Sequence, residues 1–154
     1  MEISKRLQAI ASLVPQNTNV VADIGTDHGY IPIYLVKNNI VNKCIACDIN
    51  KAPLMSAKRN INLYNLTHSI ETRLSDGLSK IKPGESDAII IAGMGGMLII
   101  DILDKNLELV KGTPLLILQP QLDVDKVRKY IHLINFTIAD EQMIYEDGKY
   151  YTII

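Results

Sequence analysis

The sequence NTNVVADIGTDHGYIPIYL, residues 17–35, combines an apolar run, a turn with two glycines and the start of a helix. The apolar run over residues 20–24 is rich in β-branched side chains, which predicts a buried strand. Gly25 and Gly29 follow, and Pro32 falls in the expected first turn of the helix. Glycine lets the backbone approach a ligand closely, and a helix N-terminus offers free N–H groups. The segment therefore predicts an α/β sheet that holds a nucleotide-like ligand at the carboxyl edge of its strands.

The glycines of this segment have an informative spacing. The pattern is Asp23-x-Gly25-x-x-x-Gly29, and it lacks the G-x-G-x-x-G of a dinucleotide-binding fold. The spacing therefore argues against an NAD-dependent oxidoreductase. A tight strand–helix connection that binds no ligand is the alternative interpretation of these residues alone.

Length and composition indicate one soluble domain. The chain has 154 residues, of which 47% are apolar and 21% charged, and its net charge of −1 predicts no strongly basic surface. Contact with a nucleic acid would need a local basic patch. The first residues, MEISKRLQ, predict a helix start and no signal peptide, and no apolar run is long enough to span a bilayer. We therefore expect a cytoplasmic location.

Cys44 and Cys47 form a C-x-x-C pair, which in other proteins supports redox or zinc chemistry. Here residues 43–49 are predicted to form a strand, in which positions three apart face opposite sides of the sheet. No second Cys or His pair stands at zinc-finger spacing. The pair is therefore interpreted as two buried core thiols.

The chain is predicted to alternate strands and helices up to residue 134. Beyond that point, residues 136–146 and 149–154 flank Asp147-Gly148, which predicts a β-hairpin. The expected fold class is α/β, with a mostly parallel twisted sheet, helices on both faces and a C-terminal antiparallel hairpin. The expected helices cover residues 2–14, 30–38, 51–64, 97–106 and 123–134, and the strands after the first cover residues 43–49, 69–73, 86–92 and 114–118.

Polar residues and glycines follow the predicted strands at the edge where a ligand would bind. Asp48 ends the second strand and is suited to accept hydrogen bonds from both hydroxyls of a ribose, although an N-cap for the next helix is an alternative. Asp76-Gly77 follows the third strand, where Asp76 is either a ligand acceptor or a turn residue. The segment Gly93-Met94-Gly95-Gly96 ends the central strand, and its glycines suggest close approach by a ligand.

Seven short motifs together resemble one family, the bacterial tRNA (adenine-22-N1)-methyltransferases, over essentially the whole chain. DIGTDH and GMGG are the most specific of them. Two residues depart from the family pattern: Gly29, where alanine is frequent, and Gln121, where asparagine is. Family members also carry a further C-terminal helical region, so the chain is expected to be a catalytic core over residues 1–154 that binds tRNA weakly. The motifs are SKRL at 4–7, DIGTDH at 23–28, SAKR at 56–59, DG at 76–77, IAGMGG at 91–96, LQP at 118–120 and EDGK at 146–149.

The resemblance implies a Rossmann-like class I methyltransferase that moves a methyl group from S-adenosyl-L-methionine to N1 of an adenine in tRNA. It implies a monomer with tRNA as partner and with neither metal nor membrane. Asp27 is the expected electrostatic partner of the purine, and for His28 a structural role in the loop is equally compatible. The implied cofactor-binding residues are Asp23, Gly25, Gly29, Asp48, Ile49, Asp76, Gly77 and Gly93, and the implied catalytic residues are Asp27, His28, Gly93, Met94, Gln119 and Pro120.

Two alternatives from other classes accompany this interpretation. An RNA-binding module that kept the fold and lost the chemistry would be favoured by loss of Asp48 or the glycines, and these residues are present. A methyltransferase that acts on a different substrate is the second alternative. The destination of a labelled methyl group would separate these possibilities.

Overall fold

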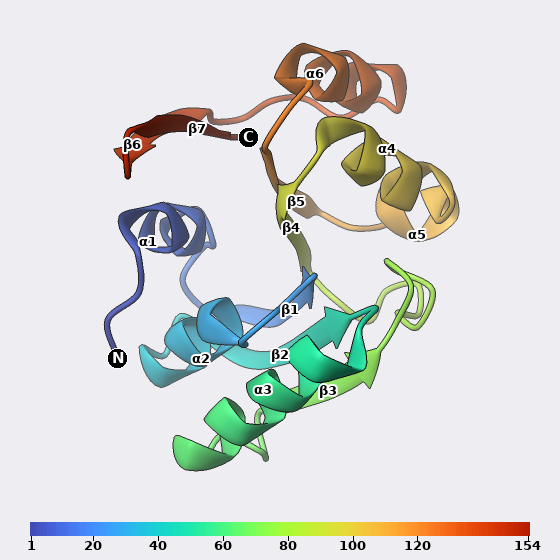
Figure 1. Ribbon diagram of the computed structural model, residues 1–154. Helices are drawn as coiled ribbons and strands as arrows, with labels where there is room; N and C mark the ends of the chain where they lie inside the picture. The colour runs from blue at the N-terminus through green and yellow to red at the C-terminus, as the bar shows by residue number, and fades with distance from the viewer.

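The computed structural model describes all 154 residues and contains a five-stranded parallel sheet in the order β3-β2-β1-β4-β5 (Figure 1). The chain crosses from one half of this sheet to the other between β3 and β4, so that β1 and β4 lie side by side at its centre. All five strands point the same way, and their carboxyl ends share one edge. The strands are β1 Thr18–Ile24, β2 Val41–Asp48, β3 Ile70–Leu74, β4 Ala88–Met94 and β5 Leu115–Pro120.

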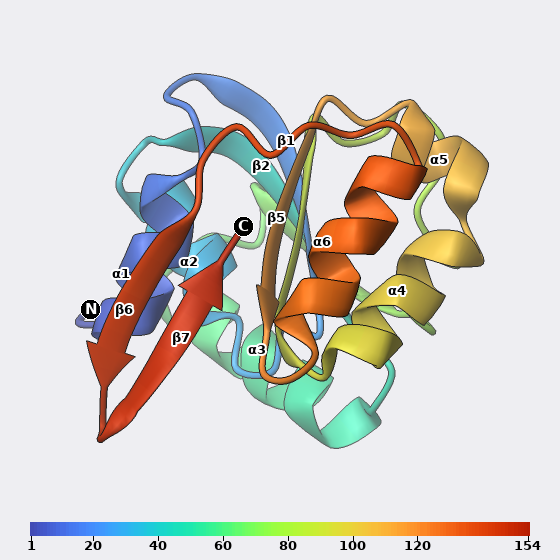
Figure 2. The ribbon, with the colours of Figure 1, turned by 90° about the horizontal axis from the view of Figure 1, so that it is seen from above.

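Helices cover both faces of the sheet, as predicted. The first three helices pack on one face and the last three on the other (Figures 1 and 2). The two faces bury apolar clusters of equal size, 18 residues each, so the sheet is the middle layer of three. No helix is both long and apolar enough to cross a bilayer. The helices are α1 Lys5–Ser12, α2 Tyr30–Lys37, α3 Lys51–Leu63, α4 Gly96–Asp104, α5 Leu107–Lys111 and α6 Val124–Leu133.

The central strand β4 confirms the prediction of a strand buried on both faces. Ile89, Ile90 and Ile91 are fully buried, with Ile90 in one apolar cluster and its two neighbours in the other. The strand continues two residues beyond the predicted end, because Gly93 adopts a φ of +77° and forms an irregularity in the pairing with β5. The short helix α5 was not predicted, and α1 begins at Lys5, after Ser4 Oγ accepts the Leu7 N–H.

The C-terminal hairpin is present, with β6 at Gln142–Glu146 and β7 at Lys149–Ile153. Asp147 and Gly148 have φ values of 49° and 77°, as the Asp-Gly turn requires. Residues 136–141 are not part of a strand, which corrects the predicted first half. The hairpin forms a two-stranded sheet of its own and meets β5 through one residue pair, in which Ile154 and Leu118 exchange N–H···O bonds of 2.7 and 2.8 Å. Figure 2 shows it beside α1, with its tip beyond the sheet.

The two cysteines are buried thiols on opposite faces of β2, as predicted. Cys44 belongs to the apolar cluster under the first three helices, and Cys47 to the cluster under the last three. Burial raises the pKa of the Cys47 thiol to about 12, and the pKa of Cys44 also lies well above its usual value for the same reason. Thiols that stay protonated are poor nucleophiles, so both serve the core.

Candidate functional site

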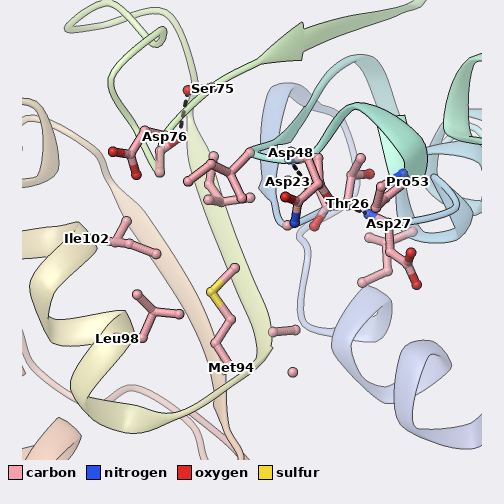
Figure 3. Close-up of a pocket in the computed structure, with 18 of the residues that line it drawn as sticks. Asp23, Thr26, Asp27, Asp48, Pro53, Ser75, Asp76, Met94, Leu98 and Ile102 are labelled. Carbon is pink, nitrogen blue, oxygen red and sulfur yellow. Dashed lines mark hydrogen bonds between the residues drawn. The ribbon is translucent and has the colours of Figure 1, made fainter. Parts of the chain in front are cut away.

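A cleft of about 670 Å³ opens at the carboxyl edge of the parallel sheet (Figure 3). The loops after β1, β2, β3 and β4 form its walls, together with part of α1 and one side of α4. Most of the residues predicted for the site therefore meet in one place, although they come from distant parts of the sequence. The predicted residues that line the cleft are Asp23, Gly25, Asp27, His28, Asp48, Ile49, Asp76, Gly77, Gly93 and Met94.

The loop after β1 is anchored to the neighbouring strand. The N–H groups of Gly25 and Thr26 both donate to the carbonyl oxygen of Cys47, at 2.9 and 2.8 Å. Gly25 has a φ of +76°, and a Cβ at this position would lie 2.4 Å from the Met94 Cε. The backbone conformation therefore calls for glycine here, whereas the flexible end of Met94 could move to admit a Cβ. The loop passes close to the floor of the cleft without a side chain to fill it.

Asp23 is a buried carboxylic acid at the base of this loop, only 3% exposed. Burial raises its pKa to about 7, and repulsion from the nearby Asp48 carboxylate adds to the rise. A cation in the cleft would stabilise the ionised form of Asp23 and would be attracted to it in return. The buried Thr26 hydroxyl lies beside this carboxyl and opposes the rise of its pKa, although the two groups do not reach full hydrogen-bond geometry. Both groups therefore have unused capacity toward a polar, positively charged ligand.

Asp48 ends β2 and uses both of its carboxylate oxygens to hold backbone. Oδ2 accepts the Asp27 N–H at 3.1 Å, and Oδ1 accepts the Asn50 N–H at 2.9 Å. Asn50 is the N-cap of α3, and its side chain makes no capping bond. Each carboxylate oxygen has a second lone pair, so Asp48 can brace these two loops and still accept hydrogen bonds from a ligand in the cleft.

Asp27 and His28 project from the same loop at the mouth of the cleft. Asp27 has a φ of 53°, a left-handed conformation that few residues other than glycine adopt, and its side chain is 66% exposed. Its carboxylate lies 3.6 Å from the His28 Nε2, and the His28 ring stacks on Tyr30 with 5.3 Å between centroids. The loop thus presents a carboxylate to whatever enters the cleft from solvent.

The turn after β3 supplies another acid. Ser75 is buried and donates its hydroxyl to the Gly77 carbonyl oxygen at 2.8 Å, which fixes the turn. Asp76 is exposed, and Figure 3 shows it at one end of the cleft. The turn role predicted as an alternative therefore falls to Ser75, and the Asp76 carboxylate is available to a ligand.

Apolar side chains face these acids across the cleft. Leu98 is 50% exposed toward the cleft, and Ile49, which is next to Asp48, is 59% exposed. Figure 3 shows Leu98 and Ile102 of α4 on one side and Asp23 and Asp48 on the other, with Met94 between them. A flat, partly apolar ligand with hydroxyl groups and a positive charge, such as a modified nucleoside, matches this combination.

Gln119 and Pro120 were predicted to form the opposite wall, and the structure places them behind it. Both are buried, and neither lines the cleft. Gln119 Oε1 instead accepts the Gly93 N–H at 3.2 Å and a hydrogen bond from Arg6 Nη1 at 2.8 Å. Arg6 does line the cleft and was missed, because the sequence gives no sign that α1 reaches the end of β5. The only local signal was the SKRL motif around it.

Gly29, which was predicted to bind the cofactor, also does not line the cleft. It is the N-cap of α2, with a φ of +75°, and a Cβ there would lie 3.2 Å from the Cβ of Ala57 in α3. Its contribution is to let α2 start under the cleft and to let α2 and α3 approach closely. In this chain an alanine at position 29 would be strained by the backbone conformation.

Comparison with known proteins agrees with this geometry. Residues 3–154 match the family model described as "Methyltransferase domain". The whole chain is 42% identical to the tRNA (adenine(22)-N(1))-methyltransferase of Bacillus subtilis, and it spans 64% of that protein. The structure of M. capricolum TrmK with S-adenosyl-homocysteine has a TM-score of 0.89 at 37% identity, with 99% of this chain and 67% of that one covered.

A third relative has a very similar structure. Streptococcus pneumoniae Sp1610 in complex with S-adenosyl-L-methionine has a TM-score of 0.95 at 37% identity, with 99% of this chain and 71% of that one covered. The similarity extends over the helices on both faces and over the hairpin, since almost all of this chain is matched. The chain belongs to the methyltransferase domain family, in the group formed by the bacterial tRNA (adenine22-N1)-methyltransferases.

Proposed function

We propose that this chain binds S-adenosyl-L-methionine and transfers its methyl group to N1 of adenosine 22 in tRNA. The observation that carries the proposal is the cleft itself, in which Asp23 and Asp48 flank a glycine loop opposite an apolar wall. The relatives support the same assignment, because one is named for this reaction and others were solved with the cofactor or its product. Residues 1–154 act as the methyl-transfer domain in this proposal, and we expect it to be a monomer.

The residues of the cleft fit the three parts of this cofactor. Asp48 would hold the ribose hydroxyls, with Ile49 next to it against the purine. Asp76 would accept a hydrogen bond from the adenine amino group. The buried carboxyl of Asp23 and the unpartnered hydroxyl of Thr26 suit the charged amino-acid end, where a cation favours ionised Asp23.

The cofactor, when bound, supplies an electrophilic methyl group on a sulfonium. Adenine N1 has a lone pair in the plane of the ring, so the acceptor needs no base to remove a proton. N1 lies on the Watson–Crick edge, so a paired target base must first leave its helix. The protein therefore has two tasks, which are to align the acceptor and to stabilise the positive charge that the purine gains. In this proposal Asp27, the exposed carboxylate of the glycine loop, would perform the second task.

The test of this proposal follows the methyl group. With methyl-labelled cofactor, label is expected in tRNA, at N1 of adenosine 22, and no label is expected in a tRNA with guanosine at that position. Nuclease digestion and chromatography of the labelled nucleoside identify the atom. Label that enters a protein or a small molecule and leaves tRNA unmodified would show a methyltransferase of another specificity. Binding of NADH in place of the cofactor would overturn the assignment altogether.

Replacement of Asp48 by alanine is expected to weaken cofactor binding by about 1–3 kcal/mol, the scale of hydrogen bonds lost to a charged group. Two effects contribute to this loss of affinity. The ribose hydroxyls lose their acceptor, and the backbone N–H groups of residues 27 and 50 lose the carboxylate that holds them. Isothermal titration calorimetry measures it directly. The same exchange at Asp140, which is exposed and lies outside the cleft, serves as the control. Equal affinity in the two variants would remove Asp48 from the binding site.

A further inference from the structure

Arg6 is the one arginine in the cleft wall, and its guanidinium forms no ion pair; the Glu146 carboxylate accepts its backbone N–H instead, at 3.4 Å. The only other fully charged base there, Lys105, pairs with Asp101 at 2.9 Å, whereas none of the chain's six ion pairs includes Arg6. An unneutralised guanidinium in a cleft otherwise rich in carboxylates calls for an anionic ligand.

Several contacts hold the Arg6 side chain at this position. Nη1 donates to Gln119 Oε1 at 2.8 Å, and the fully buried Gln119 also accepts the Gly93 N–H. The guanidinium carbon lies 5.4 Å from the centre of the Tyr151 ring, within the range of a cation–π contact. One hydrogen bond uses one of the five donors of the guanidinium, and the others have no partner in the protein. The guanidinium is thus held in one orientation, and most of its hydrogen-bond donors have no partner in the protein.

We propose that Arg6 binds a backbone phosphate of the RNA next to the nucleotide that enters the cleft. The inference rests on the proposed function. A planar guanidinium matches a phosphate through two parallel N–H···O bonds. The purine is a poor partner, because it becomes cationic during the reaction. The one anionic group of the cofactor is its amino-acid carboxylate, and a measurement of cofactor affinity separates that partner from an RNA phosphate. Gly93, whose N–H shares the Gln119 Oε1 acceptor with Arg6, adds no side chain next to the guanidinium.

The salt dependence of tRNA binding tests this phosphate contact. For the cofactor-loaded protein, Arg6→Gln should reduce the slope of log affinity against log salt by about 0.7–0.9, the value for one phosphate contact. Affinity at low salt should fall by roughly tenfold. Arg6→Lys keeps the charge and should keep the slope. Lys43→Gln removes one charge from an exposed residue near the start of β2, away from the cleft, and should leave the slope unchanged.

Two further measurements separate a ligand contact from a structural role. Cofactor affinity should be the same in Arg6→Gln and the unmodified chain, and the urea midpoint of unfolding should fall only by the loss of the Gln119 and Tyr151 contacts. A joint loss of cofactor and tRNA affinity would instead show that Arg6 acts on the cofactor, directly or by holding Gln119 and Gly93, and would overturn the phosphate site. If the unmodified chain transfers methyl groups to tRNA and the salt slope is the same in Arg6→Gln, the phosphate site is overturned and the proposed function stands. Absence of methyl transfer in the unmodified chain would overturn the proposed function.

Discussion

Asparagine in place of Asp23 is expected to stabilise the cofactor-free domain near neutral pH and above, and to weaken cofactor binding. The Asp23 carboxyl is almost completely buried, and its pKa is raised from 3.8 to about 7 by burial and by Asp48. The folded state therefore binds this proton more tightly than the unfolded state does. The stability that the protonated form contributes is complete below about pH 4 and is lost as the pH rises to 7. The loss amounts to about 4 kcal/mol for a shift of this size.

Asparagine cannot ionise, so the variant avoids this loss. Its free energy of unfolding, relative to the unmodified chain, should therefore rise by up to about 4 kcal/mol between about pH 4 and pH 8. Urea denaturation at several pH values measures this difference. Asp125→Asn, at an exposed position on α6, should give no comparable change. Cofactor affinity should fall in Asp23→Asn, because the ionised acid attracts a cationic ligand. Parallel stability profiles for Asp23→Asn and the unmodified chain would contradict a buried, ionisable Asp23.

The Asp23→Asn variant is expected to be more stable because the Asp23 carboxyl contributes to cofactor binding but destabilises the cofactor-free domain. A carboxyl buried next to a second carboxylate is costly for any domain that does not bind a cation there. Functional sites are where such groups concentrate. The Thr26 hydroxyl beside it offsets only part of this cost, since the pKa of Asp23 stays raised.

The sheet and its functional edge could be predicted from sequence because their signals are local. Runs of β-branched residues such as Ile89 to Ile91 can be buried on both faces only in a central strand, and this strand is central. Glycines that follow such runs mark turns. Because parallel strands end at one edge, Asp48 and Asp76 were expected near Gly25, and all three line the cleft.

The features that were missed depend on contacts between distant segments. Arg6 reaches Gln119 across 113 positions of sequence, and no pattern within α1 distinguishes it from the exposed Lys5 next to it. Gln119 follows an apolar run as Asp48 does, yet its side chain is fully buried, where it accepts hydrogen bonds from Arg6 and from the Gly93 N–H. The hairpin was predicted from its turn, but its separation from the main sheet was not, because it depends on contacts with the distant strand β5, which the hairpin meets through Leu118 and Ile154.

Asp27→Asn is expected to slow methyl transfer by roughly 10–100-fold while cofactor affinity stays within a few fold, because it removes a charge that acts mainly in the transition state. Asp27 presents its carboxylate at the mouth of the cleft, and its backbone N–H, not its side chain, bonds to Asp48. Asparagine tolerates the left-handed conformation with a φ of 53°, so the loop should keep its shape. The charge is thus the main property that changes.

Single-turnover kinetics with saturating cofactor and tRNA isolate this step from binding and product release. Asp147→Asn is the matched control, since Asp147 also has a positive φ, of 49°, and lies at the hairpin tip outside the cleft. It should react at the rate of the unmodified chain. A slow Asp27→Asn with normal cofactor affinity would assign the charge stabilisation to this carboxylate. If its rate equalled that of the control, Asp27 would not be the group that stabilises the purine, and alignment of the acceptor would have to account for the rate.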